Sequence, residues 1–427
     1  MNTAFLTAHK ILAEVYFDKA FSAITLNRYL NGAASSDRSL ITKLVYGVLD
    51  TDIQTDYIVS RFVKKTNKQA QLFLKMGMYC LMNLSVPVYA VVNDIAELSK
   101  IAGDRYLVGF VNATLKNIAT SIKNNDISYP DGDKGFCIEH SYPEWAFAKL
   151  VRDYGREEAR NIASYRLPVS DCVRVNTEAI SVSEFKKLAE ATLTPTILPD
   201  AFWVKGRIRG VSEKCYTIQS LASMLVARAV GAKGVCRVLD CCSAPGGKAV
   251  YIKQLARDAS VTAQELHPHR VKLIADYFNR MGESAEIVCG DATVFNPHWE
   301  NAFDYVLCDV PCSGFGVLDS RPDIKLFRRN EDISSLMKLQ QAILSNCSRY
   351  VKNGGTLVYS TCTIFRHENM ACVEKFLKSN SDFSLSPIHL PEYAPVSGQT
   401  HYQFLPHKDK IQGFFVAKMV KELNRKL

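Results

Sequence analysis

Two cysteines in this chain each follow an apolar run that is typical of a β-strand. Cys312 lies in the segment DVPCS at 309–313, and Cys362 ends the segment STC at 360–362. A single cysteine at a strand end is usually a small core residue. Two of them, both downstream of a glycine-rich turn of the cofactor-binding kind, indicate covalent chemistry in which a thiolate attacks an electrophile. The rest of the sequence has to position these thiols and identify that electrophile.

The composition is that of a globular protein with more than one domain. The chain has 427 residues, of which 47% are hydrophobic and 22% charged, and this length is too great for one ordinary core. We expect a cytoplasmic protein, because no signal-peptide pattern opens the sequence and its most apolar stretch, 76–92, is too interrupted to span a bilayer. The thirteen cysteines are then thiols, and no metal site is expected because their spacing does not match a zinc site. The net charge of +9 permits a polyanionic partner.

The first part of the chain is predicted to be all helical. Apolar residues recur at helical spacing, for example at Leu40, Leu44 and Val48, and the connections between such runs are short. Ser36-Asp37 is placed to cap the helix that follows it. A loop with the sequence YPDGD at 129–133 indicates a domain boundary.

The patterns divide the chain into three predicted parts. The first is a helical bundle, the second a small α+β linking module, and the third an α/β domain. Their predicted bounds are 1–130, 138–217 and 218–427.

In the third part, apolar strands alternate with helices. Strands are predicted at 237–240, 261–265, 286–289, 303–308 and 356–359. This alternation predicts a doubly wound, Rossmann-like sheet, whose ligands bind beyond the carboxyl ends of the strands. Polar residues at the strand ends, among them Glu265, Asp291 and Asp309, are therefore expected to face one crevice together with the two cysteines.

The glycine-rich turn follows the first of these strands and is expected to bind a cofactor. It consists of Cys242, Ser243, Ala244, Pro245, Gly246, Gly247 and Lys248. The turn matches neither the dinucleotide fingerprint nor a P-loop, so a ligand with a carboxylate and an adenosine fits better, and we expect S-adenosyl-L-methionine. Glu265 is placed to bind ribose hydroxyls and Asp291 to bind the adenine edge. Each acid alone is more often a turn or cap residue, but their placement at successive strand ends favours binding.

These motifs, in this order, resemble those of the RNA cytosine-C5 methyltransferases of the NOL/NOP2/Sun superfamily. The segments that carry the resemblance are DCCSAPGGK at 240–248, DVPCSG at 309–314 and YSTCT at 359–363. The N-terminal helices resemble the NusB-like RNA-binding domain of the bacterial Sun, or RsmB-type, branch, and RVNT at 174–177 resembles the start of its middle module. The resemblance implies a class I S-adenosylmethionine-dependent methyltransferase that acts on a cytosine of 16S ribosomal RNA.

The resemblance also implies roles for the reacting residues. Cys362 is expected to add to C6 of the cytosine, which makes C5 reactive toward the methyl donor. Cys312 is expected to help release the product. Asp309 is expected to hydrogen-bond the edge of the base and also to line the cofactor site. In related DNA enzymes the cysteine of the Pro-Cys motif attacks instead, so the residue types alone do not assign the two thiols. Lys248 is a candidate both for favouring a thiolate and for binding the cofactor carboxylate.

The target base has to be single-stranded or flipped out to reach such a crevice. Basic residues expected to contact the RNA are Arg270, Arg321, Lys325, Arg328 and Arg329. The alternative for the basic segment is a salt-bridged loop that uses Asp319 and Asp323. Small departures from the family pattern, such as Glu265 in place of Asp and the additional Cys241, leave the target cytosine open.

Three other functions compete with this interpretation. The first is a transfer-RNA cytosine-C5 methyltransferase, from which the NusB-like extension distinguishes the chain. The second is a non-catalytic ribosome-assembly factor that binds RNA, although the intact cysteine pair argues against it. The third is a cysteine hydrolase that uses His367 beside Cys362, which leaves the glycine-rich turn unexplained. Nothing in the sequence indicates an obligate oligomer, so we expect a monomer.

Overall fold

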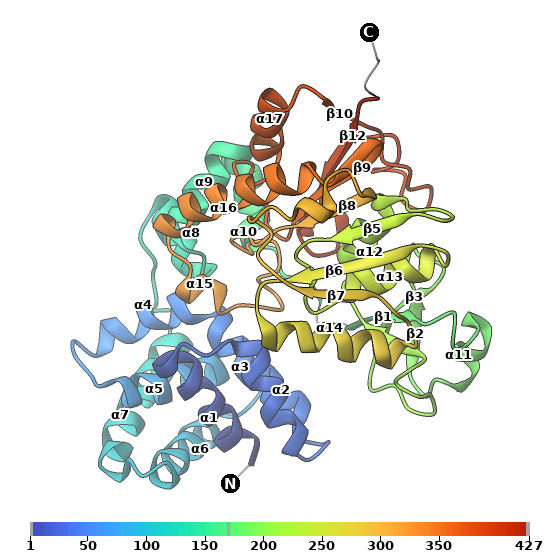
Figure 1. The fold of residues 1–427 in the computed structure, drawn as a ribbon. Coiled ribbons are helices and arrows are strands. Elements are labelled where there is room, and N and C mark those ends of the chain that lie inside the picture. Colours follow the sequence, from blue (N-terminus) through green and yellow to red (C-terminus); the bar gives the residue numbers. More distant parts are fainter. Residues whose placement is uncertain (1–2, 169–170, 424–427) are drawn as a thin grey trace. The chain divides into compact units, whose positions relative to one another are not determined.

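The computed structural model describes residues 3–168 and 171–423 and divides the chain into two compact units (Figure 1). Unit 1 comprises residues 1–164 and 317–330, and unit 2 comprises residues 165–316 and 331–427. In the described part of the chain, no helix is both long enough and apolar enough to cross a membrane.

Unit 1 is helical, which confirms the predicted fold class of the first part of the chain. Its α-helices are α1 (Thr3–Asp18), α2 (Ser22–Gly32), α3 (Arg38–Asp50), α4 (Asp52–Phe62), α5 (Lys68–Asn83), α6 (Val88–Ile101), α7 (Val108–Lys123), α8 (Gly132–Glu139), α9 (Glu144–Tyr154), α10 (Arg156–Ser164) and α15 (Ile324–Phe327), with a 3-10 turn η1 (Arg105–Leu107) before α7. Asp37 occupies the N-cap position of α3, as predicted, but its side chain accepts no cap hydrogen bond and instead accepts one from the Thr3 hydroxyl.

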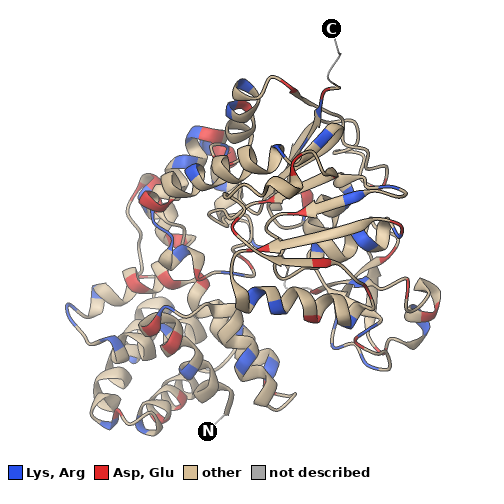
Figure 2. Cartoon of the chain, viewed as in Figure 1, with Lys and Arg blue, Asp and Glu red and all other residues tan. Residues whose placement is uncertain are grey.

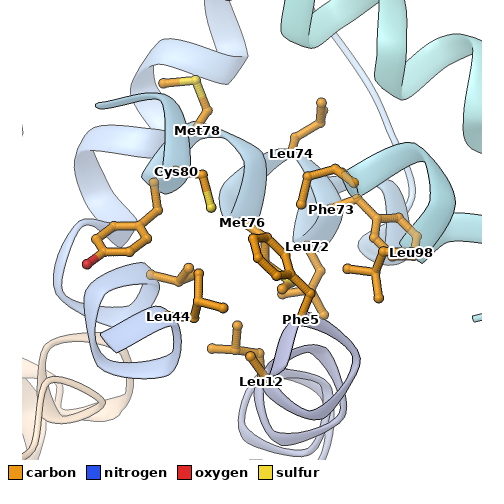
Figure 3. Close-up of a cluster of buried hydrophobic side chains, with 14 of the residues drawn as sticks. Phe5, Leu12, Leu44, Leu72, Phe73, Leu74, Met76, Met78, Cys80 and Leu98 are labelled. Atoms are coloured by element: carbon orange, nitrogen blue, oxygen red, sulfur yellow. The ribbon is translucent and has the colours of Figure 1, made fainter. Parts of the chain in front are cut away.

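Helix α5 forms the centre of the unit 1 core (Figure 3). The Asn67 side chain accepts a hydrogen bond of 2.7 Å from the Ala70 backbone N–H and so caps the start of the helix. Apolar residues on all sides of α5 are buried, as expected for a helix enclosed by others. Gly47 on α3 lies against the Tyr79 ring of α5, where even a Cβ atom would clash.

The segment 317–330 belongs to unit 1 although it follows Cys312 in the sequence. The Ser22 hydroxyl donates to Asp323, and the Lys325 ammonium is 2.5 Å from the Asp50 carboxylate. Leu326 packs against the apolar core of the helices. These interactions anchor the segment on the helical unit.

Unit 2 contains two sheets. The smaller, antiparallel sheet has the order β2-β3-β1-β4, and its elements are β1 (Asp171–Val175), α11 (Val182–Leu188), β2 (Thr192–Pro195), β3 (Ala201–Lys205) and β4 (Tyr216–Ile218). The linking module predicted at 138–217 therefore spans the division between the units, since α8 to α10 lie in unit 1. One contact that holds this part of the chain on unit 1 is the 2.9 Å hydrogen bond that the Ser141 hydroxyl accepts from Ile53 N–H at the start of α4.

The larger sheet has the order β10-β12-β9-β8-β5-β6-β7, and β11 pairs with β12. Its elements are α12 (Leu221–Val230), β5 (Arg237–Asp240), α13 (Gly247–Leu255), β6 (Ser260–Glu265), α14 (Pro268–Met281), β7 (Glu286–Cys289), η2 (Pro297–Trp299), β8 (Phe303–Asp309), α16 (Asn330–Ser348), β9 (Val351–Thr361), α17 (Met370–Ser379), β10 (Phe383–Leu385), β11 (His401–Gln403), α18 (Pro406–Asp409) and β12 (Phe415–Lys421). The five predicted strands correspond to β5 to β9, and the Rossmann-like fold is confirmed.

The chain leaves β5 in one direction to build β6 and β7, and it later returns to the other side of β5 to build β8 and β9. All these pairs are parallel, so the carboxyl ends of β5, β6, β8 and β9 lie along one edge of the sheet. Such a switch point is where α/β folds bind their ligands.

Candidate active site

The two predicted reacting thiols meet beyond the adjacent ends of β8 and β9. Cys312 Sγ and Cys362 Sγ lie 3.2 Å apart, and both residues are half-buried. Two backbone hydrogen bonds hold the loops in place: Val310 N–H donates to Ser360 O at 3.1 Å, and Gly316 N–H donates to Cys362 O at 3.0 Å. The sheet register therefore brings together cysteines that are fifty residues apart in sequence.

The surroundings of Cys312 raise its pKa. Its contact with Cys362 and the burial of its sulfur raise the pKa of Cys312 well above its usual value, and the nearby Glu368 charge adds to the shift. At 3.2 Å either sulfur can donate an S–H hydrogen bond to the other. The assignment of Cys362 as nucleophile and Cys312 as the releasing thiol stays a prediction.

Lys248 and Asp309 form an ion pair next to the thiols. Lys248 Nζ is 2.6 Å from Asp309 Oδ2, and the Ser360 hydroxyl donates to Asp309 Oδ1 at 2.7 Å. Burial alone would lower the pKa of Lys248, but the Asp309 carboxylate and further negative charge, including that of Cys362, raise it above its usual value. The lysine is therefore a fixed positive charge between the cofactor-type turn and the thiols.

Asp240, which ends β5, is a buried acid that was not among the predicted site residues. Burial raises the pKa of Asp240 to about 7, and the charge of Asp309 adds to the shift, while Lys248 opposes it. Asp240 could have been predicted as a site residue from the sequence, because it ends a strand directly before the glycine-rich turn.

The glycine-rich turn has the shape of a ligand cradle. Its start is tied to β6, because Ser243 N–H donates to Gln264 O at 2.9 Å. Gly246 has a φ of 107°, a left-handed conformation that favours glycine, and it lets the chain pass close to Tyr277 of α14. The buried Gln264 Oε1 accepts no hydrogen bond within the described part of the chain and is available to a ligand, while the Ser243 side chain interacts with the Asp240 carboxyl.

Glu265 is buried at the end of β6, and its Oε1 atom accepts from His267 N–H at 3.1 Å and from Arg270 Nη1 at 3.2 Å. Arg270 Nη2 also donates to the Ala244 carbonyl at 3.3 Å. Arg270, expected to contact RNA, thus braces the glycine-rich turn. Asp291 is exposed after β7, where its Oδ1 atom accepts from Thr293 N–H at 2.8 Å.

The other four predicted RNA-contact residues lie in the segment anchored on unit 1. Arg321 and Arg329 are exposed and Arg328 is half-buried, whereas Lys325 is buried with its ammonium paired to Asp50. Lys325 would have to break that ion pair to reach a phosphate. Lysine and arginine residues also occur on helices of both units (Figure 2).

Sequence reasoning missed a buried polar network behind the Cys312 loop. Glu368, which has no exposed surface, accepts from Ser313 N–H at 2.8 Å, from the Ser313 hydroxyl at 2.5 Å and from Gln340 Nε2 at 3.0 Å. The Ser313 hydroxyl is also 2.8 Å from the hydroxyl of Thr363, the residue after Cys362. The network therefore links the loops that carry the two thiols.

Cys241, Cys308 and Cys347 form a second group of thiols. Their sulfur atoms lie within 4.8 Å of one another, and all three residues are buried in the apolar core of the large sheet. Structural zinc sites have four ligands. The group has three members in the described part of the chain, and buried thiols also serve as small apolar residues.

The fold and site define a class of protein. A doubly wound sheet with a glycine-rich cradle after β5, an acid at the end of β6 and a free polar group at the switch point is the Rossmann-like fold of S-adenosyl-L-methionine-dependent methyltransferases. The unpartnered Gln264 Oε1 is an acceptor, so it fits a ligand that carries amino or hydroxyl groups.

The chain belongs to the family described as 16S rRNA methyltransferase RsmB/F. The model of that family matches residues 232–420, and the model of the NusB family matches residues 4–120. The cofactor of this family is S-adenosyl-L-methionine.

Relatives match over nearly their whole length. A probable ribosomal RNA small subunit methyltransferase B of Bacillus subtilis (strain 168) is 34% identical, with 97% of this chain and 98% of that protein covered. A protein of the same description from Synechocystis sp. is 30% identical, with 99% and 100% covered. The solved structure titled "Crystal Structure of PH0851" shares the fold, with a TM-score of 0.82, 21% identity and 98% of both chains covered.

Proposed function

We propose that this protein transfers a methyl group from S-adenosyl-L-methionine to C5 of a cytosine in 16S ribosomal RNA, through a covalent bond between Cys362 and C6 of the base. The observation that carries the proposal is the 3.2 Å separation of the Cys312 and Cys362 sulfurs beside the Lys248–Asp309 ion pair. Membership of the 16S rRNA methyltransferase family supports the substrate.

Cys362 acts as the nucleophile in this mechanism. Lys248 places a positive charge near Cys362 and so favours its thiolate, and the Cys312 thiol donates a hydrogen bond to it. Addition of the thiolate to C6 breaks the C5–C6 double bond and leaves electron density at C5. The cofactor supplies an electrophilic methyl group to that carbon.

Asp309 positions the base. Its carboxylate is fixed by Lys248 and by the Ser360 hydroxyl, so it can accept a hydrogen bond from the amino group of cytosine and stabilise a proton at N3. Protonation of N3 withdraws electrons from C6 and eases the attack of the thiolate. Asp309 lies at the end of β8, on the strand whose following loop carries Cys312.

Release of the product requires transfer of the C5 proton to solvent water and cleavage of the bond between Cys362 and C6, whose electrons return to the Cys362 sulfur. Cys312 is proposed as the general acid for this step, because its raised pKa keeps a proton available beside the departing sulfur. Protonation of the departing Cys362 sulfur by Cys312 assists elimination and restores the aromatic ring.

The helical unit supplies RNA affinity in this proposal, with Arg321 and Arg329 as phosphate contacts. Its match to the NusB family supports this assignment. Lys325 anchors the basic segment, and Arg270 supports the cofactor turn; neither is proposed as a phosphate contact.

The test uses the full chain, methyl-labelled S-adenosyl-L-methionine and unmodified 16S rRNA. Wild type should form 5-methylcytosine, Cys362→Ala should form none, and Cys312→Ala should accumulate a denaturant-stable RNA–protein adduct. Cys215→Ala, at the bend directly before β4, is the matched control and should behave as wild type. Label at another atom of the RNA would refute the chemistry, and label only in transfer RNA would refute the substrate.

A further inference from the structure

We propose that Cys312 and Cys362 also form a reversible oxidation site, in which a hydroperoxide converts the two thiols into a disulfide. Their sulfurs are 3.2 Å apart, and each of the two residues is half-buried and so keeps part of its surface exposed. A disulfide bond is about 2.05 Å long, so closure needs a movement of about 1.2 Å by the two sulfurs. The chemistry of the site stands on the thiols alone, while its effect on methylation rests on the proposed function.

The two cysteines are suited to consecutive steps. The Cys362 thiolate attacks one peroxide oxygen, the O–O bond breaks, and water leaves after protonation, which gives a sulfenic acid. The Cys312 sulfur then attacks the Cys362 sulfur, the S–O bond breaks, and a second water molecule leaves with the thiol proton. Two thiols lose two electrons in total, and the peroxide gains them.

The surroundings favour closure over further oxidation. Backbone hydrogen bonds from Gly316 to Cys362 and from Gly413 to Gly316, at 3.0 and 2.7 Å, hold the loops together. The sulfenic acid therefore forms with its resolving thiol already adjacent. Without that thiol, the same sulfur would proceed to the irreversible sulfinic acid.

Oxidation at this pair has a direct consequence for the proposed reaction. A disulfide removes the nucleophile and the releasing thiol together, and a thiol reductant restores both. A base that is covalently attached to Cys362 blocks the peroxide, so bound RNA should protect the pair.

Peptide mapping detects the disulfide directly. Digestion with trypsin and an Asp-specific protease isolates Cys312 in 309–318 and Cys362 in 353–366. Reduced full-length protein treated with stoichiometric hydrogen peroxide, then alkylated, should yield these two peptides joined by a disulfide. The buried thiols of the Cys241 group should be recovered reduced after denaturing alkylation.

Activity provides the second readout. Peroxide should lower methyl transfer at least tenfold in wild type, and dithiothreitol should restore it. In Cys312→Ser, peroxide should instead convert Cys362 to a sulfinic acid that dithiothreitol does not reverse, which is visible as a mass increase of the 353–366 peptide.

The two proposals can fail separately. Sulfinic acid on Cys362 of wild type without the joined peptide would overturn the oxidation site, even if the protein methylates RNA. The joined peptide in a protein that methylates no RNA would uphold the site and reject the proposed function.

Discussion

Replacing Glu368 with glutamine should loosen the Cys312 loop, which Glu368 holds through Ser313. The Glu368 carboxylate accepts from Ser313 N–H, the Ser313 hydroxyl and Gln340 Nε2, and it has no exposed surface. Hydrogen bonds to a charged group contribute about 1.5–3 kcal/mol each, and neutral ones about half as much. Because the amide nitrogen also forces the Ser313 hydroxyl to turn, we expect a loss of about 1–4 kcal/mol in the free energy of unfolding.

Three measurements separate a positioning role from a purely structural one. Urea denaturation gives the stability, with the exposed Glu374→Gln on α17 as the matched control, expected within about 0.5 kcal/mol of wild type. Steady-state turnover should fall about tenfold or more, because product release needs Cys312 in place, while the first adduct still forms. The alkylation profile of Cys312 should move to lower pH, because one of the negative charges that raise the pKa of Cys312 is removed. Unchanged turnover and an unmoved alkylation profile would refute this reasoning.

Three further predictions, one with a control substitution, test other parts of the structure. Lys248→Met leaves the carboxylate at the end of β8 unpaired; we expect a stability loss of about 3–5 kcal/mol by denaturation and loss of methyl transfer. Gly47→Ala drives a methyl group into the Tyr79 ring and should cost about 1–3 kcal/mol, whereas Gly32→Ala, which meets open space, should be tolerated. Because the folded-state pKa of Asp240 is raised to about 7, the folded protein holds a proton that the unfolded chain loses near pH 4. Stability should therefore fall as pH rises from about 4 to 7, by up to about 4 kcal/mol, and Asp240→Asn should remove that part of the slope in denaturation measured across pH.

The sequence predicted the parts of the fold that depend on local pattern. The strand ends at Asp240, Glu265 and Asp309 could be read from apolar runs followed by polar residues, and parallel pairing then brings them to one edge. Strand β9 is longer than predicted because Gly354, with a φ of 78°, resembles a turn but lies at an irregularity in its pairing with β8. Local pattern cannot distinguish a glycine in a bulge from one in a turn.

Long-range burial was not predictable in the same way. Lys325 was predicted to contact RNA because lysines usually face solvent. In the structure its ammonium is instead paired with Asp50, which is 275 residues away in sequence. The sequence around Glu368 shows only a polar residue that follows a loop. In the structure, tertiary packing buries this residue against Ser313 and Gln340. In both cases the informative fact is the identity of a distant partner, which one sequence does not contain.

The Cys312 loop lies in the chain between interactions that belong to the two different units. Gly316, four residues after Cys312, is bound to Cys362 and Gly413 in unit 2, whereas the chain from Val317 onward belongs to unit 1 and is anchored there by Lys325. The Cys312 loop is therefore held on one side by hydrogen bonds within unit 2 and continues directly into the segment 317–330 of unit 1. In the proposed mechanism, the product-releasing Cys312 and the phosphate contacts Arg321 and Arg329 lie on one short stretch of chain. Cys362 lies on a different loop and is joined to that stretch through the hydrogen bond that its carbonyl accepts from Gly316 N–H.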